Sequence, residues 1–272
     1  MQKFNQWLAE ATKKLESNNI PSANLDAELI LSKTLECTRT FLHANNDNTI
    51  DSDKLKTANN LLERRANREP IAYITGHKEF YGHDYLVTKD TLIPRPESEQ
   101  IIEFIKKLQF NQIIQPRLVD IGTGSGCLGI TSKLERPELD VTLIDISPQA
   151  LEIAKNNATN LNAEVLIQQN DLLNNIETPY DVIVANLPYV DKTWQRSPET
   201  NYEPSVALFA EDGGMQLIKK LIPQCATKLN QNGYLIIEAD PVQHIELIDF
   251  ASDYNLNLTD CKDYILLFIH QY

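Results

Sequence analysis

The chain has 272 residues and a net charge of −13, with 42% hydrophobic and 23% charged residues. This length suits one large domain or two smaller ones, and we expect two. No apolar run approaches the roughly 18 residues of a membrane-spanning helix, and the opening residues lack the apolar stretch of a signal peptide. We therefore expect a cytoplasmic protein that does not contact a membrane.

The excess negative charge lies entirely after the first 70 residues. Residues 1–70 hold ten basic and ten acidic side chains, whereas residues 71–272 hold 15 basic and 28 acidic ones. Such a field repels the phosphates of nucleic acids, so we expect no stable nucleic-acid partner.

The cysteines and histidines predict no metal site. The four cysteines are far apart without a CxxC pair, and the five histidines show no ligand spacing near them. We interpret Cys127, which follows a glycine loop, as a small packing residue.

The first 70 residues have the pattern of a helical bundle. Apolar residues recur at three- and four-residue spacing in segments that begin at Phe4 and at Leu55, and "PSANLDAELILSKTLE" predicts a helix between them. We assign residues 1–72 to an N-terminal helical domain.

The next segment predicts a β-hairpin. "IAYITGHKEFYGHDYLV" is rich in aromatic and β-branched residues, is broken by Gly76 and Gly82, and leads into a loop with two prolines. We assign residues 73–92 to a hairpin linker.

Helix and strand patterns alternate through residues 93–272. The predicted helices are "SEQIIEFIKKL", "SPQALEIAKNNATNL" and "GMQLIKKLIPQCATKL". The predicted strands are "RLVDIG", "DVTLID", "AEVLIQQND", "YDVIVAN", "GYLIIEAD" and two more in "LNLTDCKDYILLFIHQY". This alternation predicts an α/β, Rossmann-like domain with a seven-stranded, mostly parallel sheet covered by helices on both faces.

A glycine loop after the first of these strands is a candidate cofactor site. In "VDIGTGSGCLG", the glycines allow a tight turn and a close approach of backbone N–H groups to a ligand. The loop is neither the GxGxxG of dinucleotide binders nor a P-loop. The candidate cofactor-binding residues of this loop are Gly122, Thr123, Gly124, Ser125 and Gly126.

Two acids follow the next two strands. Asp145 lies about twenty residues beyond the loop, where a carboxylate accepts hydrogen bonds from ribose hydroxyls; the alternative is a cap for the following helix. Asp171 and the adjacent Leu172 are placed to lie beside an adenine ring. An equally good alternative is that Asp171 is an exposed acidic residue of a loop. The glycine loop together with these two acids fits S-adenosylmethionine better than NAD, because none of these residues is placed to bind a pyrophosphate.

The tetrapeptide Asn186-Leu187-Pro188-Tyr189 ends the fourth strand. Pro188 has no N–H and favours an extended Leu187. The Asn186 side-chain oxygen and the Leu187 carbonyl can then accept both hydrogens of a planar NH₂ group, while Tyr189 packs on its flat face. Such a group is a carboxamide or the exocyclic amine of a base. The alternative is a strand-ending turn with a core tyrosine.

Taken together, these motifs resemble the HemK-type protein-(glutamine-N5) methyltransferases, which modify class 1 peptide chain release factors. "REPIAYITGHKEFYGHDYLV", "LIPRPESE", "VDIGTGSGCLGI", "DISPQAL", "NYEPSVAL" and "EDGG" carry the resemblance over nearly the whole chain. The PRPES loop and the YEPxxAL segment separate this family from nucleic-acid methyltransferases with similar NPPY motifs. Here Leu187 replaces the family's usual first proline, and Glu238-Ala239-Asp240 replaces its usual EIG.

The resemblance implies a class I S-adenosylmethionine-dependent fold and a function in translation termination. The substrate would be the glutamine of the release factor's Gly-Gly-Gln motif. Asn186 and Tyr189 would bind its amide and act as catalytic residues, and Asn186 would also lie near the cofactor. The helical domain would hold the release factor. We expect a monomer. For Arg95 we expect mainly a structural role, such as an ion pair with Glu97 or Glu99.

Two other functions stay open at this point. Some RNA adenine-N6 methyltransferases carry NLPY, so a nucleic-acid methyltransferase is the main alternative, although the acidic field counts against it. The third possibility is a binding module on ribosomes or release factors with a vestigial enzyme fold.

Overall fold

A computed structural model describes residues 2–110 and 113–271, which form two compact units. Unit 1 comprises residues up to His77 together with Arg196–Tyr202, and unit 2 comprises Lys78–Gln195 and Glu203 onward. No helix in the described part of the chain combines the length and the apolar character that a membrane span requires.

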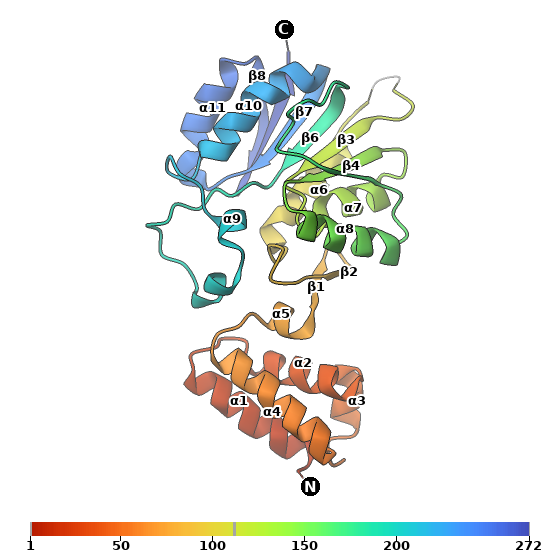
Figure 1. Cartoon of the computed structure of the whole chain (residues 1–272), viewed down its shortest axis with the longest axis vertical. Coiled ribbons are helices and arrows are strands. Elements are labelled where there is room, and N and C mark those ends of the chain that lie inside the picture. The colour runs from red at the N-terminus through yellow and green to blue at the C-terminus, as the bar shows by residue number, and fades with distance from the viewer. Residues whose placement is uncertain (1, 111–112, 272) are drawn as a thin grey trace. The chain divides into compact units, whose positions relative to one another are not determined.

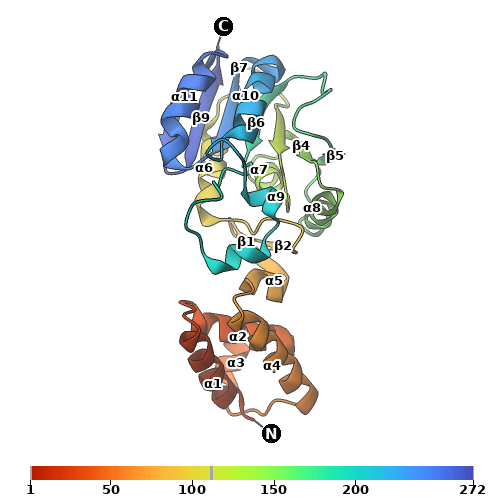
Figure 2. The same cartoon turned by 60° about the vertical axis from the view of Figure 1, so that its left-hand side comes forward.

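Unit 1 is a helical bundle. Its helices are α1 (Phe4–Ser17), α2 (Ala23–Leu35), α3 (Arg39–Ala44), α4 (Ser52–Ala66) and α5 (Ile71–Thr75), followed much later by the short 3₁₀ helix η2 (Pro198–Tyr202). Figure 2 shows the helices of this bundle. The apolar stripes of α1, α2 and α4 form one core that contains Trp7, Leu15 and Leu31. The predicted helical bundle is confirmed.

Two of these helices differ from the sequence-based expectation. Residues 73–75 were assigned to the hairpin linker, but together with Ile71 and Ala72 they form α5, which is followed by Gly76 with φ of +81°. Ala72 and Ile74 are buried, and this burial outweighs the β propensity of the segment. The prediction also lacked α3, whose N-cap residue Thr38 accepts a hydrogen bond from Phe41 N–H through its side chain.

A buried ion-pair network joins distant parts of unit 1. Arg65 on α4 donates to Asp26 on α2 over 2.6 Å and to Glu199 over 3.1 Å. Arg68 donates to the other oxygen of Glu199 over 2.8 Å. Because Asp26 and Arg65 are nearly inaccessible to solvent, each depends on the other to offset its desolvation.

Glu199 makes the stability of unit 1 depend on pH. Burial opposes its ionisation, but hydrogen bonds from Ser197, Arg68 and Arg65 outweigh it and lower its pKa from 4.5 to about 2. The stabilisation is therefore complete above pH 4.5 and is lost as the pH falls toward 2. We expect Glu199→Gln to lower the midpoint of thermal unfolding strongly at pH 6 and much less at pH 3.

The chain offers a selective probe for this measurement. Its two tryptophans are Trp7 and Trp194, so Trp194→Phe leaves the buried Trp7 as the single tryptophan, whose emission then reports on unit 1. The exposed Glu16 on α1 serves as the control, because Glu16→Gln should change the midpoint little at either pH. An effect of Glu199→Gln that is the same at both pH values would contradict this assignment.

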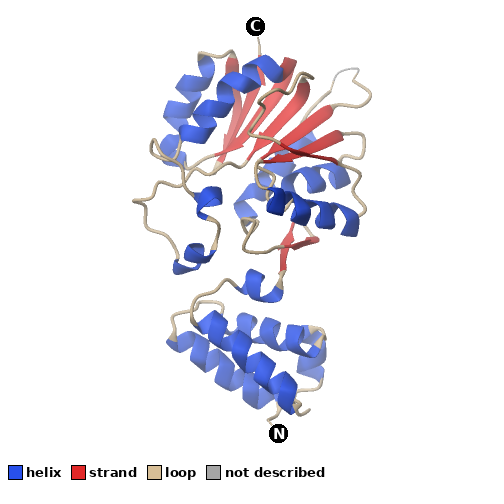
Figure 3. Ribbon diagram, viewed as in Figure 1, coloured by secondary structure: helices blue, strands red, loops and turns tan. Residues whose placement is uncertain are grey.

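Unit 2 contains a seven-stranded sheet with the order β5-β4-β3-β6-β7-β9-β8. The strands are β3 (Arg117–Ile121), β4 (Asp140–Asp145), β5 (Leu166–Gln169), β6 (Tyr180–Ala185), β7 (Leu229–Glu238), β8 (Leu256–Lys262) and β9 (Ile265–His270). The first five strands in this order run parallel, and β9 pairs antiparallel with both β7 and β8. Figure 3 shows the strands as one twisted sheet. The predicted seven-stranded, mostly parallel sheet is confirmed.

The remaining elements of unit 2 cover this sheet or connect its strands. They are the hairpin strands β1 (His77–Phe80, whose first residue belongs to unit 1) and β2 (His83–Leu86), the helices α6 (Glu99–Lys107), α7 (Cys127–Glu135), α8 (Pro148–Asn160), α9 (Ser205–Leu208), α10 (Gln216–Lys228) and α11 (His244–Ser252), and the 3₁₀ helices η1 (Pro96–Ser98) and η3 (Pro241–Gln243).

The sheet is buried on both faces. Along β6, Val182 and Val184 belong to the core with α6, α7 and α8, whereas Ile183 and Ala185 belong to the core with α10 and α11 (Figure 1). This explains why "YDVIVA" is apolar without a polar face.

The topology fixes the place of a ligand site. β3 lies between β4 and β6, so the chain leaves β3 toward one side and later returns to the other. At such a switch point the loops after neighbouring parallel strands diverge and leave a crevice at their carboxyl ends. The glycine loop, Asp145 and Asn186 follow these three strands.

Candidate active site

The glycine loop begins where β3 ends. Gly122, Gly124 and Gly126 have φ values of +70°, +56° and +84°, a region that other residues enter only at a cost. The N–H groups of Gly122 and Thr123 donate to the Ile144 carbonyl at the end of β4 over 2.8 and 2.9 Å. The loop is thus folded back against the neighbouring strand.

Asp120, the residue two positions before Gly122, stabilises the glycine loop through hydrogen bonds. One carboxylate oxygen accepts from the Thr123 hydroxyl over 2.6 Å and from Gly129 N–H over 3.0 Å. The other oxygen is buried without a hydrogen-bond partner in the described part of the chain. Burial raises the pKa of Asp120 to about 6. Asp120 does not line the cavity described below, so its contacts serve the shape of the loop.

Asp145 lies at the end of β4 and faces the loop. Its two oxygens accept from Gly124 N–H and Ser147 N–H, each over 2.9 Å. Helix α8 is capped by the Ser147 side chain, which accepts from Ala150 N–H, so the cap comes from a different residue. Each carboxylate oxygen keeps a lone pair with which it can accept a ribose hydroxyl.

Asp171 and Leu172 lie just beyond β5. Asp171 accepts from Lys220 over 2.7 Å and from Asn174 over 3.1 Å, and its side chain is 43% exposed. Leu172 is buried with φ of +51°.

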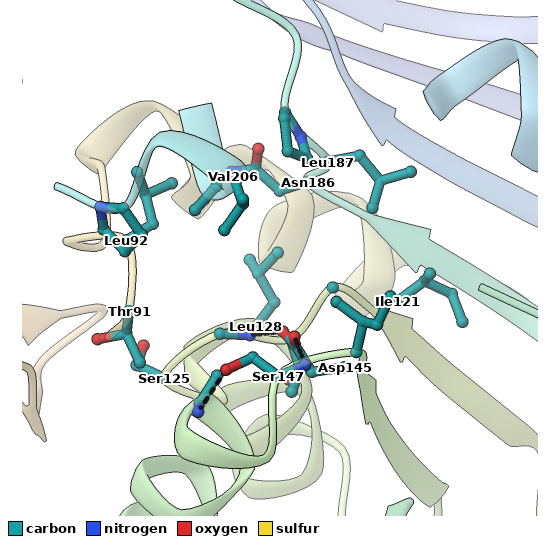
Figure 4. A pocket seen from close by; sticks show the side chains of 18 of the residues that line it. Thr91, Leu92, Ile121, Ser125, Leu128, Asp145, Ser147, Asn186, Leu187 and Val206 are labelled. Carbon is teal, nitrogen blue, oxygen red and sulfur yellow. Dashed lines mark hydrogen bonds between the residues drawn. The ribbon is translucent and has the colours of Figure 1, made fainter. Parts of the chain in front are cut away.

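A cavity of about 570 Å³ lies over these strand ends and is lined wholly by unit 2. Its size is that of a cofactor or drug-sized ligand. Figure 4 shows Asn186 and Asp145 on opposite sides of it, with Thr91, Leu92 and Val206 along its border. The predicted site residues among its lining are Gly122, Thr123, Gly124, Ser125, Asp145, Asp171, Leu172, Asn186, Leu187 and Pro188.

Gly126 and Tyr189 are not among these lining residues. A side chain at Gly126 would meet Ile130 and Ala154, so this position serves the packing of α7 and α8. The Tyr189 hydroxyl donates to Glu238 over 3.0 Å, away from the lining. Burial and the Glu238 charge raise the pKa of Tyr189 above its ordinary value, which keeps its hydroxyl a hydrogen-bond donor.

The backbone of Tyr189 is held in place by Gln243 and Gly214. Its carbonyl accepts from the Gln243 side chain over 2.8 Å. Gly214 lies so close that a Cβ there would be 1.9 Å from the same carbonyl oxygen. Only glycine fits at position 214 while the tetrapeptide keeps this place.

Asn186 is oriented by two residues that the sequence analysis did not assign to the site. Its side-chain nitrogen donates to the Ser98 hydroxyl over 3.1 Å, and Ser98 donates to Glu238 over 2.5 Å. The Asn186 oxygen is therefore left to accept from a substrate. Ser98 lay in the noted PRPES loop and Glu238 in the noted strand end, but nothing in the sequence predicts that they meet.

Two loops that border the cavity are joined by Arg95 and Glu203. Arg95 donates to one oxygen of the buried Glu203 over 2.5 Å, and Ile93 N–H donates to the other over 3.1 Å. The structural role expected for Arg95 fits this contact, but its partner is Glu203 in place of Glu97 or Glu99.

Comparisons with known proteins agree on the family. Residues 6–76 match the PrmC N-terminal domain, and residues 101–201 match the methyltransferase small domain. The chain is 40% identical to the release factor glutamine methyltransferase of Koribacter versatilis, over 88% of this chain and 89% of that one. The chain belongs to the release factor glutamine methyltransferase family.

A second relative supports this result, and a solved structure shares the fold. The release factor glutamine methyltransferase of Leptospira interrogans is 36% identical, over 86% of this chain and 84% of that one. The solved structure of a methyltransferase from Pyrococcus furiosus shares the fold, with a TM-score of 0.55 and 17% identity over 78% of this chain and 99% of that one. The chain is therefore a methyltransferase, and the relatives do not favour the nucleic-acid alternative.

S-adenosylmethionine is the methyl donor, and the residues present fit it. The loop glycines offer backbone N–H groups, and Asp145, which lines the cavity, offers acceptors for two hydroxyls. The cavity volume is adequate for such a molecule.

The leucine that departs from the family pattern has a defined place. Leu187 is only 4% exposed, and its δ-methyl would lie 2.9 Å from a Cβ at Gly122. The rigidity that a proline ring would supply is here replaced by packing on the first glycine of the cofactor loop. This contact links the substrate motif to the cofactor loop.

We expect Asp145 and Asp171, the two candidate cofactor-binding acids, to differ in importance. Asp145→Ala should weaken S-adenosylmethionine binding about 10–100-fold, because it removes charged hydrogen bonds to the ligand and to Gly124 N–H. Asp171→Ala should weaken binding only a few-fold, because that carboxylate is half exposed and already paired with Lys220. Calorimetry on both variants gives the comparison, and equal losses would contradict the ribose role of Asp145.

Proposed function

We propose that this enzyme methylates the side-chain amide of the glutamine in the Gly-Gly-Gln motif of class 1 release factors, at N5. The observation that carries the proposal is the orientation of Asn186, whose nitrogen is bound by Ser98 and whose oxygen is left for a donor. A carboxamide NH₂ is such a donor, and the family membership names glutamine. The predicted site residues and their roles are part of this proposal.

The reaction is a direct displacement. When bound, S-adenosylmethionine supplies a sulfonium methyl group that the amide nitrogen attacks, so that a C–N bond forms, the C–S bond breaks with its electron pair on sulfur, and one proton is released. We assign the cofactor to the glycine loop, Asp145, Asp171 and Leu172.

Asn186 and Leu187 prepare the nitrogen. An amide nitrogen is a weak nucleophile because its lone pair is delocalised. Two acceptors, the Asn186 side-chain oxygen and the Leu187 carbonyl, hold both N–H groups and increase the electron density on nitrogen. As the nitrogen gains positive charge, the same dipoles stabilise it more strongly than in the ground state. The proton then leaves to water, without a strong base.

Tyr189 and Pro188 shape the rest of the pocket. The Tyr189 hydroxyl is held by Glu238 and its carbonyl by Gln243, so the ring has a fixed position, and we propose that it packs on the flat face of the amide. Pro188 lacks an N–H that would compete for the acceptors.

The partner is a protein and not a nucleic acid in this proposal. The excess of acidic side chains in residues 71–272 supports it, because nucleic-acid phosphates would be repelled. We further propose that residues 1–72 help to bind the release factor, that residues 73–92 link them to the methyltransferase domain, and that the enzyme acts in the cytoplasm as a monomer.

Mass spectrometry tests the proposal. Full-length release factor is incubated with the enzyme and S-adenosylmethionine, and the Gly-Gly-Gln peptide is analysed. We expect one added methyl group on the glutamine, and none on a factor in which that glutamine is alanine. Methyl transfer to RNA in place of the factor would overturn the proposal.

A further inference from the structure

Two hydroxyl groups converge on a buried carboxylate behind the substrate motif. Glu238, the last residue of β7, is 1% exposed and accepts from Ser98 over 2.5 Å and from Tyr189 over 3.0 Å. An ionised carboxylate can only accept hydrogen bonds. Burial raises the pKa of Glu238, and hydrogen bonding from Ser98, Tyr189 and the Asn186 amide opposes that shift by stabilising the charge.

The charge on Glu238 determines how Asn186 is turned. Ser98 has a single hydroxyl hydrogen, and Glu238 takes it, so the Ser98 oxygen can only accept from its other neighbour. That neighbour is Asn186, 3.1 Å away. If the Asn186 amide turned over, its oxygen would face an oxygen that has no hydrogen to offer, and both would lose a hydrogen bond.

We propose that Glu238, acting through the Ser98 hydroxyl, is a positioning residue that makes Asn186 present its oxygen to the substrate and thereby selects an amide over a carboxylate. This inference deepens the proposed function and rests on it. Glu238 itself does not line the cavity, whereas Ser98 and Asn186 do.

The selection concerns glutamine against glutamate. The two side chains have nearly the same size and shape, so packing cannot separate them. A glutamine NH₂ brings two hydrogens to the Asn186 oxygen and the Leu187 carbonyl. A glutamate carboxylate brings only lone pairs and a negative charge to the same acceptors, and the fixed Asn186 cannot turn to offer its nitrogen.

Inhibition by a release factor with Gly-Gly-Glu in place of Gly-Gly-Gln measures this selection. The quantity of interest is the inhibition constant of the Glu factor divided by the KM of the Gln factor, because contacts elsewhere on the factor cancel in this ratio. For the wild type we expect a ratio of at least about ten, since an unpaired buried polar group costs at least that much.

Glu238→Met is the main variant. It keeps the volume but removes the acceptor, so Ser98 can donate to Asn186 and the amide can turn. We expect the ratio to fall about tenfold, mainly because the Glu factor binds more tightly, while S-adenosylmethionine affinity stays within about twofold. Damage to the fold would weaken both factors alike and leave the ratio unchanged.

Two further variants keep the test decisive. If Glu238→Met does not fold, the isosteric Glu238→Gln provides the test. Its amide can donate to the Ser98 oxygen, so the Ser98 hydroxyl becomes free to donate to Asn186. Glu246→Met, at an exposed residue paired with Lys219, is the control and should keep the wild-type ratio. A folded Glu238 variant with the wild-type ratio would overturn the inference.

The outcome separates this inference from the proposed function. If the wild type does not methylate the Gln factor, the proposed function fails. If it does, but accepts the Glu factor as well as the Gln factor, or if loss of Glu238 leaves the ratio unchanged, the inference alone fails.

Discussion

Asn186→Ala is expected to lower kcat/KM for release factor methylation about 10³-fold, as the loss of one preorganised transition-state contact does in other enzymes. The substitution removes the acceptor that holds the substrate N–H and stabilises the positive charge on nitrogen. The affinity for S-adenosylmethionine should stay within a few-fold, because we assign most of the cofactor contacts to Asp145 and the glycine loop, which line the cavity. Initial rates with labelled cofactor, together with calorimetry, measure both quantities.

Asn156→Ala is the matched control. Asn156 is exposed on α8, so the same substitution there should leave both the rate and the cofactor affinity unchanged. A strong loss of cofactor binding by Asn186→Ala, with kcat preserved, would show that Asn186 is chiefly a cofactor ligand.

Arg65→Met is expected to destabilise unit 1 by about 3–5 kcal/mol, because it leaves Asp26 as a buried charge without its partner. The methionine retains much of the arginine's packing, so the loss reports mainly on the charge. Urea unfolding followed by Trp7 fluorescence, in the Trp194→Phe background, gives the free energy of unfolding for this unit. Trp7 reports on the folding of unit 1 because it is 2% exposed and its indole N–H donates a hydrogen bond to Asn59.

The neighbouring arginine is the control for this prediction. Arg64 pairs with Glu69 at the surface, where its side chain is 45% exposed. Exposed pairs contribute little, so Arg64→Met should cost under about 1 kcal/mol. Equal losses from both variants would contradict the buried network as the source of stability.

Strong local periodicity made most of the fold predictable from the sequence. The two buried strands "RLVDI" and "YDVIVA" and the amphipathic helix α6 follow from their own residues. Segment 71–75 did not, since its β-branched residues favour a strand locally and only burial of Ala72 and Ile74 makes it helical. Such a choice depends on residues far away in the chain.

Some residues of the candidate site could likewise be predicted from local sequence patterns, and others could not. The glycine loop, Asp145 and Asn186 follow consecutive parts of an α/β pattern, and strand order alone brings them to one edge. Ser98 and Glu238 are 140 residues apart in sequence, and no local pattern predicts their contact. Likewise, the direction of the Asn186 amide depends on a hydrogen-bond chain that exists only in the folded state.

The composition of unit 1 has a consequence for its synthesis on the ribosome. Its helices α1 to α5 end before His77, but Glu199 lies in the segment that begins at Arg196, 119 residues later. At about 5–20 residues per second, that segment emerges roughly 6–24 s after the helices. During this interval Arg65 and Arg68 lack their shared acceptor, so the helical bundle of a nascent chain should be measurably less stable than that of the finished protein.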